Sequence, residues 1–80
     1  MKQIIYYTKK RKGYASSFYE LPFSLLHRLD GPAVIWPNGS KEYWINNKEL
    51  NRKEVESWIK DNNINLKTKE HQALFMLKFG

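Results

Sequence analysis

The chain has 80 residues, enough for one hydrophobic core, and we expect residues 1–80 to form a single small domain. Three Trp, five Tyr and four Phe exclude a disordered tail, and the apolar runs are too short for a membrane span or a signal-peptide core. Cysteine is absent, which excludes disulfides and thiolate metal sites and is typical of a reducing, intracellular compartment.

The net charge of +6 comes largely from one short run of the chain. Lys9, Lys10, Arg11 and Lys12 are consecutive, and the other positions carry ten basic residues against eight acidic ones. A local cluster of this kind attracts phosphates or an acidic protein surface, and it is equally consistent with a solubilising hairpin tip. The positive sign excludes a nucleic-acid mimic, which would have to be acidic.

Strand-forming residues dominate the first third of the chain. Gln3 to Thr8 and Tyr14 to Tyr19 predict a hairpin whose tip, Lys9 to Gly13, carries the basic cluster. Pro22 interrupts this pattern because proline lacks a backbone donor and restricts the residue before it. Phe23 to Leu29 then predicts a further strand.

A second hairpin is the clearest local signal. Residues 33–36 and 41–45 flank the sequence Pro-Asn-Gly-Ser, which predicts a type I turn followed by a left-handed glycine. This loop would pair Val34 with Glu42, whereas a two-residue loop would shift the register by one position. Both faces of the ribbon are apolar, so the ribbon is either covered on both sides or leaves one aromatic row for a partner.

The last third of the chain predicts two helices. Asn46 and Asn47 form a tight turn that leads into a short extended segment. Asn51 is a good N-cap for a helix from about Arg52 to Asn62, and Thr68 can cap a helix from Lys69 to Phe79. The final helix carries a run of apolar residues on all sides, so we expect it to be the most deeply buried element.

These elements predict an α+β fold, in which an antiparallel β-meander of about five short strands is followed by two C-terminal helices packing on one face. The core of such a chain is thin, and we expect a free energy of unfolding of only about 5 kcal/mol. The predicted core residues are Ile4, Tyr6, Val34, Ile45, Val55, Trp58, Leu74 and Leu77.

One motif resembles a known family. His27 to Ala33 reads H-R-L-D-G-P-A and resembles the HRxDGPA signature of MORN-like repeats in proteins of tailed bacteriophages and giant viruses. Trp36 to Lys48 is similar to the W/Y-x-x-N-x-K hairpin that follows this signature, and Leu50 to Phe79 is similar to the family's helical ending. Asn47 departs from the usual Gly, and a single full copy cannot build a solenoid. The resemblance implies a viral accessory protein that acts in the host cytoplasm.

The sequence offers no catalytic constellation. His27 lies three residues before Asp30, a spacing that the turn of the motif explains without chemistry. One helical turn after His71 come Leu74 and Phe75, which cannot bind a metal. No glycine-rich phosphate loop is present, so we expect neither an enzyme nor a cofactor.

We therefore expect a binding protein that contacts an acidic surface of a host or defence protein and inhibits or modulates it. The alternative is a basic nucleic-acid-binding protein whose exposed aromatic residues stack on bases. We expect no membrane association, and a monomer and a homodimer both stay open because edge strands can pair. The candidate contact residues are Lys9, Lys10, Arg11, Lys12, Tyr14, Phe18, Tyr19, Arg28, Trp36 and Tyr43.

Overall fold

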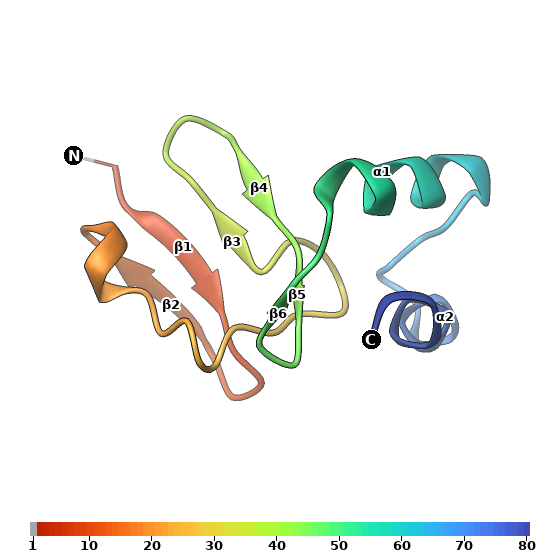
Figure 1. Ribbon diagram of the computed structural model, residues 1–80, viewed down its shortest axis with the longest axis horizontal. Helices are drawn as coiled ribbons and strands as arrows, with labels where there is room; N and C mark the ends of the chain where they lie inside the picture. The colour runs from red at the N-terminus through yellow and green to blue at the C-terminus, as the bar shows by residue number, and fades with distance from the viewer. Residues whose placement is uncertain (1) are drawn as a thin grey trace.

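The structure is a computed structural model that describes residues 2–80, and its class is α+β (Figure 1). A four-stranded sheet lies at one end and two helices lie at the other, with a two-stranded ribbon between them. The strands are β1 (Ile4–Tyr7), β2 (Lys12–Ala15), β3 (Val34–Ile35), β4 (Lys41–Glu42), β5 (Trp44–Ile45) and β6 (Lys48–Glu49). A 3₁₀ turn, η1, spans Phe18–Glu20, and the helices are α1 (Arg52–Asp61) and α2 (Lys69–Phe79).

The predicted α+β class and the antiparallel pairing are confirmed, with six short strands, but the strand order differs from that of the predicted meander. The large sheet has the order β2-β1-β3-β4, so that β1 lies in the middle and pairs antiparallel with both β2 and β3. The long connection from β2 to β3 therefore crosses the sheet. Strand β2 is left as one edge, and β5 and β6 form a separate ribbon.

The second hairpin has the predicted register. Val34 is paired with Glu42, and the Gly39 N–H donates to the Trp36 carbonyl at 2.9 Å. Gly39 has a φ of +92°, the left-handed conformation that the turn requires. The two-residue turn between β5 and β6 is also confirmed, since Asn46 and Asn47 have φ values of 48° and 72°, which asparagine tolerates better than most residues.

Both helices begin where the capping residues predict. The Asn51 side chain accepts a hydrogen bond from the Glu54 N–H at 3.0 Å, and the Thr68 hydroxyl accepts one from the His71 N–H at 3.2 Å. Helix α1 ends one residue earlier than predicted, at Asp61, and α2 has the predicted bounds.

The predicted strand from Tyr14 to Tyr19 is wrong in its bounds. Strand β2 begins inside the predicted tip, at Lys12, and ends at Ala15. The Glu20 carboxylate then accepts a hydrogen bond from the Ser16 N–H at 2.9 Å, and the Glu20 N–H donates to the Ser17 carbonyl at 3.1 Å. These two bonds close a local turn, so the aromatic residues that suggested a strand lie in η1 instead.

The predicted strand from Phe23 to Leu29 is also wrong. Only Leu26 forms a β-bridge, with Thr8, and the Leu25 N–H donates to the Pro22 carbonyl in a turn. Leu26 is fully buried and packs with Leu21 against the large sheet. The apolar residues of this segment therefore reflect its role as a cover of the sheet, not strand formation.

Two core clusters divide the molecule. The first joins the large sheet to the covering segment and contains Ile4, Tyr6, Ala15, Leu21, Leu26, Ala33, Val34 and Trp44. The second joins the small ribbon to the helices and contains Tyr43, Ile45, Leu50, Val55, Leu66 and Phe75. Side chains alternate along an extended chain, which explains why Trp44 enters the first cluster while its two neighbours enter the second. Residues 43–45 of the second hairpin are thus covered on both sides.

The helix α2 is not the most deeply buried element. Phe75 is its one fully buried side chain, and Leu77 is 82% exposed. The helix lies at the end of the molecule and packs on one side only (Figure 1), so a run of apolar residues around the helix leaves several of them in solvent. Leu74 and Leu77 are therefore removed from the predicted core, and Trp58 is only partly buried.

Candidate functional site

The basic cluster is held at the tip of the first hairpin by a threonine. The Thr8 hydroxyl accepts hydrogen bonds from the N–H groups of Lys10 and Arg11, at 3.2 and 3.1 Å. This arrangement tightens the turn and leaves all four cationic side chains, from Lys9 to Lys12, exposed. The two ion pairs found among residues 2–80 join Asp30 to Arg28 and to Lys67. The four cations of the cluster are therefore not neutralised by a carboxylate of the described chain.

Two aromatic rings extend this surface along β2. The Lys12 ammonium lies 5.6 Å from the centroid of the exposed Tyr14 ring and 5.9 Å from that of Tyr7. Contacts at these distances are cation–π interactions, which are weak at exposed sites. They place a cation and an exposed aromatic ring side by side on the outer face of the sheet.

The exposed aromatic residues of η1 follow at the other end of β2. Tyr19 is 92% exposed and Phe18 is 53% exposed, and their rings meet edge to face at 5.8 Å. Phe18 is held by Phe23, at 5.0 Å, and by a stacked Trp36 ring, at 6.3 Å. A large ring that is fixed from one side and open to solvent on the other is typical of a residue that anchors a partner.

Seven of the ten predicted contact residues therefore lie on one stretch of chain. We call this stretch the edge surface, because it consists of the edge strand β2 and the turns at its two ends. All seven side chains are exposed to solvent. The edge surface comprises Lys9, Lys10, Arg11, Lys12, Tyr14, Phe18 and Tyr19.

Arg28 does not belong to this surface, and the prediction for it is corrected. Its Nε donates to the Asp30 carboxylate at 2.6 Å, and its guanidinium lies 3.8 Å from the Tyr7 ring centroid. A third contact goes to the Pro32 carbonyl at 2.9 Å, which leaves the side chain only 13% exposed. Gly31 lies close to this side chain, since a Cβ at that position would be 3.0 Å from the guanidinium carbon. The residues of the motif therefore contact one another. This agrees with the expectation that the turn explains the motif without chemistry.

Tyr43 and Trp36 are also less available than predicted. Tyr43 is 6% exposed and packs edge to face on Phe75 inside the second cluster, so it is corrected to a core residue. Trp36 is partly buried, and its indole N–H donates to the Glu42 carboxylate at 2.8 Å. The second oxygen of Glu42 accepts from the Trp44 indole at 3.0 Å. The Glu42 carboxylate thus accepts a hydrogen bond from both indole N–H groups. The Trp36 ring in turn stacks on the ring of Phe18.

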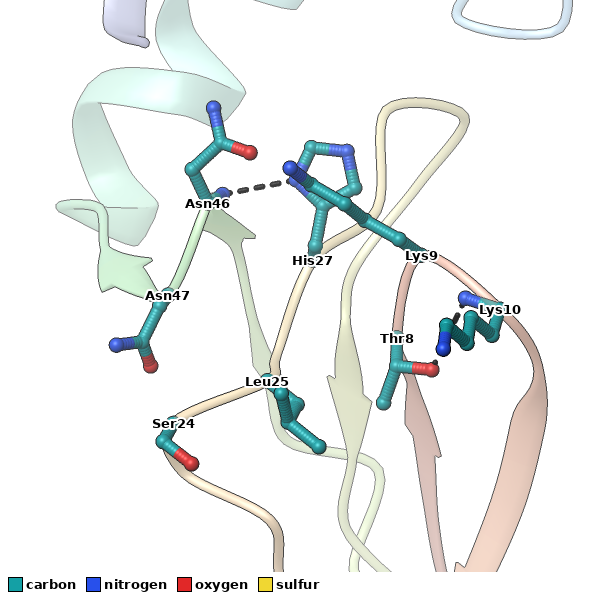
Figure 2. Close-up of a pocket in the computed structure, with 8 residues that line it drawn as sticks. All are labelled: Thr8, Lys9, Lys10, Ser24, Leu25, His27, Asn46 and Asn47. Carbon is teal, nitrogen blue, oxygen red and sulfur yellow. Dashed lines mark hydrogen bonds between the residues drawn. The ribbon is translucent and has the colours of Figure 1, made fainter.

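A shallow concavity lies beside the basic tip (Figure 2). Lys9 reaches toward the His27 imidazole, and Lys10 folds back beside Thr8. Sequence reasoning missed the remaining lining residues, Ser24, Leu25, Asn46 and Asn47, because the turn between β5 and β6 reaches the tip only through tertiary structure. Nothing in the sequence marks Leu25 as exposed, since it stands between Ser24 and the buried Leu26 in a largely apolar segment.

His27 connects the concavity to the fold. Its Nδ1 accepts a hydrogen bond from the Asn46 N–H at 2.8 Å, so the neutral ring carries its proton on Nε2. Burial lowers the pKa of His27 below its ordinary value of 6.5, and the nearby Lys9 charge lowers this pKa further. The Arg28 hydrogen bond likewise lowers the pKa of Asp30.

The His27 geometry predicts a pH-dependent stability. Because the pKa is lower in the folded state, the stabilisation is fully present above pH 6.5 and is lost as the pH falls through the folded pKa. We expect the urea midpoint, followed by tryptophan fluorescence, to decrease between about pH 7 and pH 5. A His27→Gln variant should lack this part of the decrease. Identical pH profiles for the two proteins would contradict the assignment.

Asp30 also contributes stability that is lost on acidification. Its pKa is lowered in the folded state, so this loss occurs at pH values below its ordinary pKa of 3.8.

Comparison with protein-family models, curated proteins and solved structures finds no match to this chain. Among residues 2–80, no helix is both long and apolar enough to cross a membrane. Over the same part of the chain, no group of three or more His, Asp or Glu side chains lies close enough together to hold a metal ion. The functional interpretation therefore depends on the surface itself.

Proposed function

We propose that this chain is a small bacteriophage accessory protein that binds a host or defence protein in the host cytoplasm and inhibits or modulates it. The edge surface carries the proposal. Its main support is that Phe18 and Tyr19 stay exposed at one end of β2 while a cluster of unpaired cations stays exposed at the other end. Trp, Tyr and Arg dominate the energetics of protein interfaces, and exposed aromatic side chains add little to the stability of a free domain. The viral origin is supported by the resemblance of His27 to Ala33 to phage and giant-virus MORN-like repeats.

The charge of the edge surface indicates the kind of partner. No acidic residue lies between positions 9 and 19, and Glu20 uses its carboxylate in the local turn. An acidic partner surface would be steered toward Lys9 to Lys12, which raises the association rate at low salt. The aromatic rings of η1 would then bury apolar area and slow dissociation. Inhibition would follow from occupation of a functional surface of the partner.

Affinity capture with matched variants tests this proposal. The wild-type chain is immobilised, exposed to lysate of the infected host, and compared with a Phe18→Ser/Tyr19→Ser variant and with Leu77→Ser. Leu77 is a suitable control because it is a highly exposed apolar residue of α2, which lies at the opposite end of the molecule (Figure 1). We expect the first variant to lose the captured protein and Leu77→Ser to retain it. With the purified partner, the double variant should bind at least about 30-fold more weakly, the effect of an interface hot spot.

Three outcomes would contradict the proposal. Equal capture by both variants would show that η1 makes no contact, and capture of no protein would remove the protein partner altogether. The third outcome concerns nucleic acid, which four adjacent exposed cations also favour. Nucleic-acid binding that weakens with salt at a slope of about 3–4 released counterions, and that disappears when Lys9 to Lys12 are replaced by alanine, would establish that alternative instead.

A further inference from the structure

We infer that the outer edge of β2 binds an acidic segment of the partner in extended conformation, which adds to the large sheet as one more strand. This inference rests on the proposed function and names the chemistry and the binding mode of the partner. It is a form of β-augmentation, in which main-chain hydrogen bonds hold a peptide on an exposed sheet edge.

The hydrogen-bond pattern shows which groups of β2 are free. The Tyr7 N–H donates toward β3, to the Ala33 carbonyl, whereas the Thr8 N–H donates toward β2, to the Arg11 carbonyl. Successive residues of a strand direct their backbone groups to opposite sides. In the observed register, Gly13 is paired with Tyr6 and therefore faces β1, while the backbone groups of Lys12 and Tyr14 face away from the sheet. No hydrogen bond found between elements in residues 2–80 uses those outward groups.

The edge strand β2 is better suited to this role than the other edges. It has four residues, while β4, at the opposite edge, and both strands of the small ribbon have two residues each. An added strand needs several consecutive main-chain bonds to compensate for the loss of conformational freedom. The turns on either side of β2 also place the basic cluster at one end of the edge and the rings of η1 at the other.

The charge of the edge selects an acidic segment over a second copy of this chain. An added strand would run beside Lys12 and the cationic tip, where acidic side chains at alternate positions find opposite charges. Two copies paired through β2 would instead bring together two chains that each carry +6, with the basic cluster of each copy close to the shared edge. A lysine on an edge strand is also a known guard against self-pairing.

Amide hydrogen exchange in the intact chain tests the inference directly. The probe is a peptide of about six residues that alternates Glu and Val. We expect a saturating amount of the peptide to slow exchange of the outward amides of Lys12 and Tyr14 about tenfold or more. The amide of Gly13 is an internal control, because it already faces β1 and should change little.

Two matched controls separate strand addition from simple charge attraction. Peptides of the same sequence that are N-methylated on either the Val or the Glu residues keep their charge but lose one row of donors, and one of the two should bind at least about fivefold more weakly. On the protein, Tyr14→Pro removes an outward N–H and should bind the unmodified peptide at least about fivefold more weakly than Tyr14→Ala, which keeps it. Proline is tolerated at such an edge position.

Each remaining outcome overturns the inference. Equal binding of all three peptides, or absence of binding, would rule out strand addition. Protection of the Lys12 and Tyr14 amides without peptide, at concentrations where sedimentation shows a dimer, would assign the edge to a second copy. None of these results would affect the capture experiment with the η1 variants, so failure of the inference and failure of the proposed function can be told apart.

Discussion

Replacing Phe75 by alanine is expected to lower the free energy of unfolding by about 3–5 kcal/mol. Phe75 is fully buried, and its ring contacts those of Tyr43, Trp58 and Phe79 at centroid distances of 5.6 to 6.4 Å. Its removal leaves a cavity at the centre of the second cluster, where the helices have no other fully buried aromatic side chain among the described residues. Because we expect a total stability of only about 5 kcal/mol, the loss should detach both helices.

Urea unfolding followed by far-UV circular dichroism measures this effect. The matched control is Leu77→Ala, which removes an apolar side chain from the exposed side of the same helix and should change the stability by less than about 0.5 kcal/mol. Equal effects of the two substitutions would show that α2 is not attached through Phe75.

Replacing Leu26 by alanine is expected to lower the free energy of unfolding by about 2–5 kcal/mol. Leu26 is the largest fully buried side chain of the first cluster, and its backbone carbonyl also accepts a hydrogen bond from the Asn47 N–H at 2.8 Å. The side chain fastens the covering segment to the large sheet, so its loss should loosen the segment that leads from η1 to β3. Tryptophan fluorescence reports the unfolding of this half, because Trp44 lies in the same cluster.

A conservative control separates packing from side-chain chemistry at this position. Leu26→Met keeps most of the volume and should lower the stability by less than about 1.5 kcal/mol. If the methionine variant were as unstable as the alanine variant, the cavity argument would be wrong. If neither variant had an effect, the covering segment would not be packed on the sheet.

The parts of the fold that the sequence predicted are those that short-range chemistry determines. The Pro-Asn-Gly-Ser loop, the asparagine turn at residues 46–47 and the two capped helices depend on backbone conformations and hydrogen bonds within a few residues. For these elements the local preference and the tertiary structure agree. The register of the second hairpin followed directly from its turn.

The errors arose where tertiary contacts use the same residue types differently. Phe18 and Tyr19 suggested a strand, but the Glu20 carboxylate closes a turn there. Leu26 suggested a strand because of its apolar surroundings, but the segment covers the sheet with buried side chains and forms only a single β-bridge to it. An apolar helix suggested deep burial, but the small domain has no element to cover the far side of α2.

Part of the candidate site could be predicted from the sequence, although its role in binding stays a prediction. Charge and aromatic content identified seven residues whose side chains the structure leaves exposed between positions 9 and 19. Exposure itself could not be predicted for Tyr43 or Arg28, because burial of the former and pairing of the latter depend on contacts with Phe75 and Asp30. Nor could the free backbone edge of β2 be predicted, since it requires the strand order of the sheet.

Photocrosslinking in the infected host gives the most direct test of the claim that the edge surface contacts a protein. A photoreactive phenylalanine analogue is introduced in place of Tyr19 in one variant and in place of Leu77 in another, two positions that are both highly exposed. We predict that irradiation joins the position-19 variant to one defined partner protein and leaves the position-77 variant uncoupled. Coupling from position 77 alone, or from neither position, would contradict the account.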